Sequence, residues 1–146
     1  MNKNFQNVYE DSKRAEAYSQ LEFPGTYYLA FRDLPRIISR HVYGKKALDF
    51  GCGAGRSTRF LQNLQFNTTG VDISRDMVKK ARERDPLGNY LVVGTGDLYQ
   101  FADNMFDLVL SVFTFDNIPT KESKKNCLEE MARVLNQSGR IINLVS

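Results

Sequence analysis

Residues 47–57 read ALDFGCGAGRS, a short apolar run that leads directly into three alternate glycines, Gly51, Gly53 and Gly55. This order predicts a buried strand, a tight loop and then a helix from Ser57. Glycines between a strand and a helix let a ligand approach the backbone closely. The alternative is a glycine-rich turn that binds nothing.

Two well-known glycine loops do not fit this stretch. The dinucleotide fingerprint G-x-G-x-x-G matches at Gly51 and Gly53 but requires a third glycine where the chain has Arg56. A phosphate-binding loop would align Gly55 and Ser57, but it requires a lysine in place of Arg56. Arginine does not replace that lysine freely, because lysine acts there as a compact point charge.

Strands and helices alternate on both sides of the loop. The pattern predicts strands over 46–50, 68–71, 90–93, 106–113 and, after a turn at 137–139, 140–145. It predicts helices over 57–65, 74–84 and 120–135, with Ser74 and Thr120 as caps and with Leu128, Met131, Val134 and Leu135 facing the core. The alternation indicates an α/β fold with a doubly wound, mostly parallel sheet and helices on both faces. Its ligand crevice should lie at the carboxyl ends of the strands.

Residues 1–45 are expected to form a helical N-terminal arm. Apolar positions at helical spacing predict helices over 12–21 and 27–42, with a break at Pro35. His41, the one histidine of the chain, is interpreted as a helix-end residue rather than a catalytic base.

Acidic residues stand where the second and third strands end. Asp72 follows Gly51 by 21 positions and is placed to accept hydrogen bonds from the two hydroxyls of a ribose. Its alternative role is that of a helix-entry residue. Asp97 could accept a hydrogen bond from the amino group of an adenine, with Leu98 and Ile73 on either side of the ring, or it could be an ordinary turn residue.

The fourth strand ends in Phe113, an apolar residue that we expect near the reactive end of the ligand. Asp116 and Asn117 follow it before Pro119. These two residues either contribute to the site or only turn and cap the chain, and the sequence does not separate the two roles.

Composition excludes several classes of function. Twenty basic and 17 acidic residues leave a net charge of +3, which gives no argument for a nucleic-acid partner. One histidine and two cysteines 75 positions apart cannot form a multi-histidine metal site, a zinc knuckle or a disulfide framework, so no metal is expected and the cytoplasm is the expected location. The longest apolar stretch is far below the ~20 residues of a membrane-spanning helix.

The residues from 46 to 146 resemble a class I S-adenosylmethionine-dependent methyltransferase, a Rossmann-like fold. The resemblance lies in the glycine loop, in the strand end 70–74, in 96–98, in the strand 106–111 and in the late run 130–140, all in the order and spacing of the family. It implies S-adenosylmethionine as the cofactor, with S-adenosylhomocysteine as the product.

The resemblance also implies roles for individual residues. Those implied to bind the cofactor are Asp49, Gly51, Cys52, Gly53, Asp72, Ile73, Gly96, Asp97, Leu98 and Phe113. Gly51 and Gly53 would lie against its methionine part, and Asp49 would position the loop or the cofactor's amino group. Tyr18, Tyr27 and Tyr28 resemble the segment that covers the cofactor and shapes the substrate pocket. No catalytic residue is implied.

The implied activity is transfer of a methyl group to a small-molecule acceptor by in-line displacement. Two signatures of nucleic-acid methylation are missing: an Asn/Asp-Pro-Pro-aromatic run after the fourth strand, where the chain reads DNIP, and a Pro-Cys nucleophile. One alternative is a cofactor-binding domain or fragment without turnover. A less favoured alternative is a nicotinamide-dependent oxidoreductase.

The chain length suggests that the fold continues past the last residue. Five strands are used by Ser146, whereas the resembling family continues with a helix and two further strands. The last strand, 140–145, would then be an exposed apolar edge, which proteins avoid. We expect either a chain truncated at its C-terminus or an edge covered by a partner, as in a homo-oligomer.

Overall fold

The computed structural model describes residues 26–146. The helix predicted over 12–21 and the predicted substrate residue Tyr18 lie outside these described residues.

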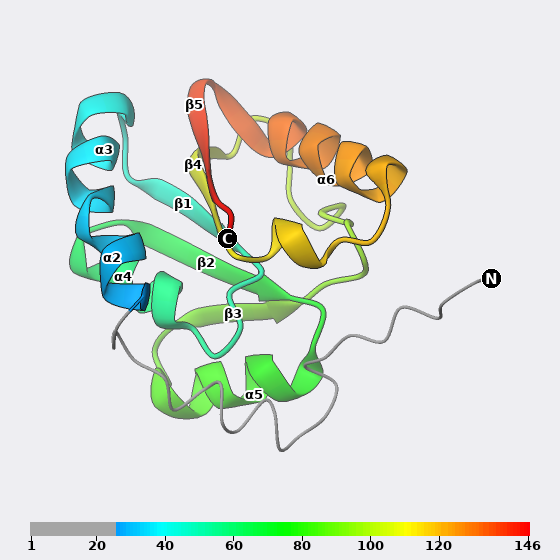
Figure 1. Ribbon diagram of the computed structural model, residues 1–146, viewed down its shortest axis with the longest axis horizontal. Coiled ribbons are helices and arrows are strands. Elements are labelled where there is room, and N and C mark those ends of the chain that lie inside the picture. Colours follow the sequence, from blue (N-terminus) through cyan, green and yellow to red (C-terminus); the bar gives the residue numbers. More distant parts are fainter. Residues whose placement is uncertain (1–25) are drawn as a thin grey trace.

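The described chain contains one five-stranded sheet in which every neighbouring pair of strands is parallel (Figure 1). Its strands are β1 (Lys46–Phe50), β2 (Asn67–Asp72), β3 (Asn89–Val92), β4 (Phe106–Val112) and β5 (Leu135–Leu144), in the spatial order β3-β2-β1-β4-β5. This order confirms the doubly wound sheet. The winding reverses between β1 and β4, where such sheets bind their ligands.

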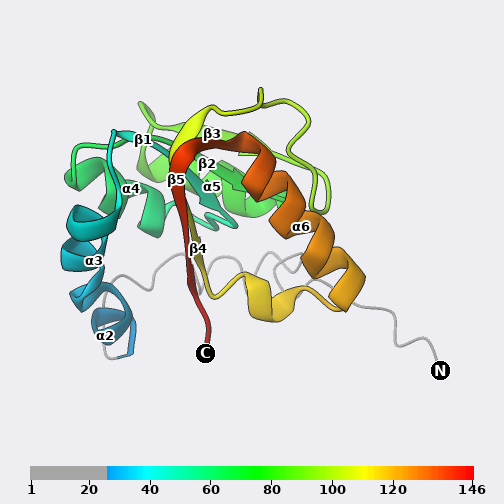
Figure 2. The ribbon, with the colours of Figure 1, turned by 90° about the horizontal axis from the view of Figure 1, so that it is seen from above.

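Helices cover both faces of the sheet. They are α2 (Thr26–Arg32), α3 (Leu34–His41), α4 (Arg56–Asn63), α5 (Arg75–Arg84), the short 3₁₀ helix η1 (Phe115–Asn117) and α6 (Lys121–Val134). Figure 2 shows α2, α3 and α4 on one side of β4 and β5 and α6 on the other. Alternate residues of β1 serve the two sides: Ala47 packs in the core under α3 and α4, and Leu48 and Phe50 pack in the core under α6.

The predicted helix breaks and caps are present. The first long helical run divides between Arg32 and Leu34, which puts Pro35 in the first turn of α3, where its missing N–H removes no hydrogen bond. Ser74 accepts a hydrogen bond from the Met77 N–H, and Thr120 caps α6 in the same way. His41 is the exposed last residue of α3, as expected.

Two predictions in the last third of the chain are wrong. Leu128 does not face the core but is 42% exposed, because the buried face of α6 is turned toward Cys127 and Met131. The fifth strand begins at Leu135, directly after α6, instead of at Arg140. Leu135 already pairs with Phe106, and a register shift between Phe106 and Leu108 takes up the extra residues that suggested a turn.

Strand β5 lies at one edge of the sheet and pairs only with β4 among the described strands. Its apolar side chains near the C-terminus are half-buried: Ile141 packs toward the α6 side, and Ile142 and Leu144 pack toward the α3 side. No helix within residues 26–146 is long and apolar enough to cross a membrane.

Candidate functional site

The glycine loop folds back over the end of β2. Gly51, Gly53 and Gly55 all have positive φ, at 76°, 53° and 83°. The N–H groups of Gly51 and Cys52 both donate to the Val71 carbonyl, at 2.8 and 2.9 Å. A Cβ atom on Gly51 would overlap the Thr114 side chain, so only glycine fits at this position.

Asp72 joins the glycine loop to the start of α5. Its Oδ2 accepts the Gly53 N–H at 2.8 Å, and its Oδ1 accepts the Ser74 N–H at 2.9 Å. Burial raises the pKa of Asp72, and the backbone N–H groups oppose this shift. The helix-entry role therefore exists in the structure. It does not preclude a ligand, because each carboxylate oxygen can accept a further hydrogen bond.

Asp49 is fully buried beneath the loop and fixes the start of α4. Its Oδ2 accepts hydrogen bonds from Ser57 Oγ and Thr58 Oγ1, both at 2.6 Å. Its Oδ1 has no partner among the described residues. Burial raises the pKa of Asp49 to about 6, although the two hydroxyl donors act in the opposite direction.

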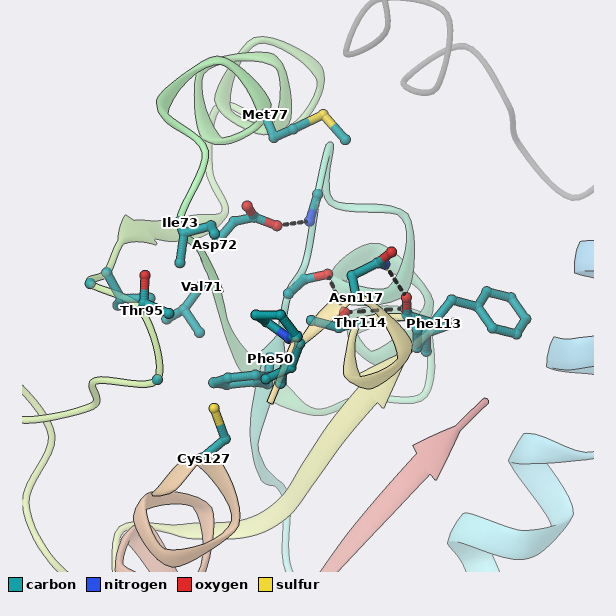
Figure 3. A pocket seen from close by; sticks show the side chains of 18 residues that line it. Phe50, Val71, Asp72, Ile73, Met77, Thr95, Phe113, Thr114, Asn117 and Cys127 are labelled. Carbon is teal, nitrogen blue, oxygen red and sulfur yellow. Dashed lines mark hydrogen bonds between the residues drawn. The ribbon is translucent and has the colours of Figure 1, made fainter. Parts of the chain in front are cut away.

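The glycine loop, the end of β2 and the end of β4 surround a cleft (Figure 3). Six of the predicted site residues line it, namely Gly51, Gly53, Asp72, Ile73, Gly96 and Phe113. Asn117, whose role the sequence left open, also lines the cleft. Several other lining residues were not predicted, among them Phe50, Val71, Met77, Val93, Thr95, Val112, Thr114, Ile118 and Cys127. Apolar side chains predominate, as is usual for a small-molecule site.

Four predicted cofactor-binding residues do not line the cleft: Asp49, which lies beneath the loop, and Cys52, Asp97 and Leu98. Cys52 packs below the loop against α5, so only its backbone belongs to the loop. Asp97 accepts the Tyr99 N–H at 2.9 Å, which is the turn role left open by the sequence. Leu98 is fully buried in the core on the α6 side, and its N–H donates to Glu130 Oε2 at 3.1 Å. The structure therefore does not place Leu98 on a ligand.

Helix α6 holds the segment that follows Gly96. Arg133 donates to the carbonyl groups of Leu98 and Phe101, both at 2.9 Å, and it pairs with Glu130 at 2.8 Å. Hydrogen bonding to Arg133 lowers the pKa of Glu130, which keeps this carboxylate ionised as the acceptor for the Leu98 N–H. This side of the cleft thus depends on residues about 30 positions further along the chain.

An aromatic pair stands at the opposite rim of the cleft. The Tyr27 ring meets the Phe113 ring edge-on, with centroids 6.0 Å apart, and the Arg56 guanidinium lies 4.0 Å over the Tyr27 ring. Phe113 has a φ of 55°, and Asn117 Nδ2 donates to its carbonyl at 2.9 Å. Figure 3 shows the Phe113 ring directed away from the centre of the cleft. Tyr28 is 59% exposed and lines no part of the cleft.

A family model described as "Methyltransferase domain" matches residues 48–143, from β1 to the end of β5. The chain belongs to the class I S-adenosylmethionine-dependent methyltransferase family.

Similar proteins differ in the substrates that their names give. The chain is 36% identical over 101 residues to demethylmenaquinone methyltransferase of Tropheryma whipplei, covering 68% of this chain and 41% of that protein. It is 29% identical over 136 residues to "Probable tRNA methyltransferase 9B" of Homo sapiens, covering 93% of this chain and 27% of that protein. The chain thus spans less than half the length of these relatives.

Solved structures share the fold. The PH0226 protein of Pyrococcus horikoshii matches with a TM-score of 0.73 and 27% identity, over 88% of this chain and 64% of that one. A TehB-like S-adenosylmethionine-dependent methyltransferase of Corynebacterium glutamicum matches with a TM-score of 0.65 and 24% identity, over 88% and 72%. Because the chain belongs to this family, the alternative of a nicotinamide-dependent oxidoreductase is not retained.

The residues of this family member fit the family's cofactor, S-adenosylmethionine. The loop excludes a side chain at Gly51, the Asp72 carboxylate stands in the cleft wall, and Asp49 Oδ1 is a buried acceptor without a partner in the described chain. Residues 26–146 contain no cluster of three or more His, Cys, Asp or Glu side chains able to hold a metal ion.

Proposed function

We propose that the chain binds S-adenosylmethionine in this cleft and transfers its methyl group to a small-molecule acceptor. The observation that carries the proposal is the position of Asp72, a half-buried carboxylate at the end of β2 that is bonded to the glycine loop and lines an apolar cleft. One stretch of the chain supplies the loop and the acid, and residues after β3 and β4 complete the apolar wall.

Each part of the cleft has a role in this proposal. The Asp72 carboxylate accepts the ribose hydroxyls, and the backbone of Gly51 and Gly53 lies along the amino-acid end of the cofactor. Asp49 Oδ1 accepts a hydrogen bond from the cofactor's ammonium group or from a water that bridges to it. Ile73, which is 41% exposed at the cleft, covers the adenine.

The chemistry requires alignment more than acid–base catalysis. When bound, S-adenosylmethionine supplies a methyl group that its sulfonium already activates. The chain contributes by orienting the acceptor and excluding water with Phe113, Ile118 and Pro119 at the cleft's edge. Holding the reacting groups at attack distance can supply roughly 7–11 kcal/mol. Alignment by the cleft can therefore supply a large part of the rate acceleration.

The residues that line the cleft around the end of β4 are mostly apolar. Apolar surroundings favour a compact organic acceptor over a polyanion. The lysine pairs at 45–46, 79–80 and 124–125 do not line the cleft. Among relatives, one name gives a quinone and another gives tRNA as the acceptor, so a substrate panel should include both.

Calorimetry with S-adenosylhomocysteine tests cofactor binding. We expect micromolar affinity for the wild-type chain and about 100-fold weaker binding for Asp72→Ala, since charge-assisted hydrogen bonds contribute about 1.5–3 kcal/mol each. Asp76→Ala, which removes an exposed acid four positions away, is the matched control and should bind like the wild type. Equal affinity in a folded Asp72→Ala would remove the ribose role, and no binding to the folded wild type would refute the proposal.

Methyl transfer is tested separately with radiolabelled cofactor and a panel of small molecules and tRNA. Transfer to a small molecule alone is the expected result. Cofactor binding without transfer to any acceptor would instead support a binding domain without turnover.

We also propose a cytoplasmic location and a β5 edge that is covered by a partner chain. Both cysteines are buried and free, which suits a reducing compartment. Pairing of β5 with a second copy of the chain would satisfy its outer edge, and it predicts a dimer in sedimentation measurements.

A further inference from the structure

Tyr90 belongs to β3, but its ring lies beneath the glycine loop that follows β1. Tyr90 is paired with Gly70 of β2, and a Cβ atom on Gly70 would lie 2.9 Å from Tyr90 Cδ1. The absence of a side chain at Gly70 therefore leaves room for the ring to cross β2 toward the loop. There the ring is 2% exposed and packs with Cys52 of the loop and with Val78 and Ala81 of α5. Tyr90 thus supports the loop from below and does not line the cofactor cleft.

The hydroxyl end of Tyr90 meets the loop at Gly55, the N-cap residue of α4. Gly55 has a φ of 83°, and a Cβ atom at this position would lie 2.7 Å from the Tyr90 hydroxyl oxygen. The first turn of α4 carries Ser57 and Thr58, whose hydroxyl groups hold Asp49. The position of the Tyr90 hydroxyl therefore affects the end of the loop and the start of α4 together.

Asp85, the C-cap residue of α5, fixes the Tyr90 hydroxyl. Its Oδ2 accepts a hydrogen bond from Tyr90 Oη at 2.7 Å and another from Gln62 Nε2 of α4 at 3.0 Å. Burial and the hydrogen bond to Asp85 raise the pKa of Tyr90, so the hydroxyl keeps its proton and stays a donor. One carboxylate thus connects the end of α5, the middle of α4 and the ring beneath the loop.

We propose that Tyr90 is a positioning residue for cofactor binding, whose hydroxyl, held by Asp85, keeps the glycine loop in its binding conformation. Tyr90 acts through Gly55 and Cys52 and not by contact with the ligand. The inference rests on the proposed function, because it assumes that the cofactor's amino-acid end lies along this loop.

Calorimetry with S-adenosylhomocysteine tests the role of the hydroxyl in the full chain. Tyr90→Phe keeps the ring and removes the hydrogen bond to Asp85, and we expect the affinity to fall about fivefold, as the loss of one such bond allows. The matched control is Asn89→Ala, which removes a hydrogen bond of 2.9 Å to Thr69 between the same two strands. Its affinity should stay within about twofold of the wild type. The measurements are made where all variants are folded, so that a lower global stability alone does not weaken binding.

Asp85→Ala removes the same hydrogen bond from the acceptor's side. We expect this variant to bind S-adenosylhomocysteine at least as weakly as Tyr90→Phe. The double variant Tyr90→Phe/Asp85→Ala should bind no more weakly than Asp85→Ala, since both changes break one bond. Fully additive losses would show that the two residues act independently and would overturn the proposal.

Hydrogen exchange separates a positioning role from a purely structural one. The N–H groups of Gly51 and Cys52 are bonded to the Val71 carbonyl, and that of Gly53 is bonded to Asp72. In Tyr90→Phe these three amides should exchange faster by a larger factor than the amides within β2 and β3, and Asn89→Ala should show no such bias.

Two results would overturn the positioning role of Tyr90. One is wild-type affinity in Tyr90→Phe, and the other is equal acceleration of exchange in the loop and in the strands. Failure of the wild type to bind S-adenosylhomocysteine would instead refute the proposed function, and the exchange rates would still show whether Tyr90 holds the loop.

Discussion

The two sides of the cofactor cleft are built in different ways. On the side of β1 and β2, the carboxylates of Asp49 and Asp72 hold the glycine loop through partners that lie within 20 positions along the chain. On the other side, the segment after Gly96 is held by Glu130 and Arg133, more than 30 positions away. The first side follows from a local motif, and the second depends on how α6 packs.

This difference also decides which parts of the cleft could be predicted from the sequence. The glycine loop, Asp72 and the cap at Ser74 could be predicted because loop, acid and helix start follow one another at fixed spacing. The structure places them together in the wall of one cleft. The surroundings of Leu98 could not be predicted, because no residue near it in the chain indicates that its N–H is bonded to Glu130.

The largest expected effect is a loss of stability when Gly51, on the side of the cleft built from a local motif, is replaced. Gly51→Ala would require an alanine at a φ of 76° with its Cβ against Thr114. Strain and overpacking together should lower the unfolding free energy by about 3–4 kcal/mol. Urea denaturation measures this loss. A decrease under about 1 kcal/mol would mean that the loop can move away from Thr114 at little cost.

The second-largest effect is a pH dependence of the unfolding free energy, which Asp49 causes on the same side of the cleft. Its pKa is about 6 in the folded chain against an ordinary value of 3.8, so the folded state binds this proton more tightly. Its contribution to stability is therefore complete below pH 4 and is lost as the pH rises through 6. At about 1.4 kcal/mol per pH unit, the loss is on the order of 2–3 kcal/mol.

Comparison of the wild type with Asp49→Asn isolates this contribution, since the amide side chain of the variant does not titrate and the other titrating groups cancel. Urea denaturation between about pH 4.5 and 7.5 should show the wild type losing stability relative to the variant. A difference that is constant over this range would contradict the raised pKa of Asp49.

The smallest effect tests the side of the cleft that is held by residues distant in the sequence. Arg133→Met removes the hydrogen bonds to Leu98, Phe101 and Glu130, which should loosen the wall at Gly96 and weaken S-adenosylhomocysteine binding about tenfold. Lys125→Met, which breaks an exposed ion pair with Glu129 on the same helix, is the matched control. If both variants bind the ligand equally, α6 does not shape the cleft.

The rotation of α6 and that of the helix in the N-terminal arm could not be predicted for the same physical reason. Leu128 and Cys127 are adjacent apolar residues, and the angle at which α6 meets the sheet decides which one is buried. Tyr27 and Tyr28 are likewise adjacent, and only Tyr27 reaches Phe113. Periodicity identifies the helix in each case, but the packing sets its rotation.

Contacts across the sheet also explain the missed residues. Thr114 reaches the Gly51 carbonyl, a partner 63 positions away, and Cys127 approaches Gly96 across the cleft. A threonine after a strand and a cysteine inside a helix carry no local signal of such positions. Only the arrangement of β1, β4 and α6 brings them to the cleft.

A crystal structure of the chain with S-adenosylhomocysteine tests the proposed cleft most directly. We expect the ribose hydroxyls on the Asp72 carboxylate, the amino-acid end along Gly51 and Gly53, and no ligand atom on Leu98. A ligand that binds without touching Asp72, or one that binds outside this cleft, would contradict this assignment.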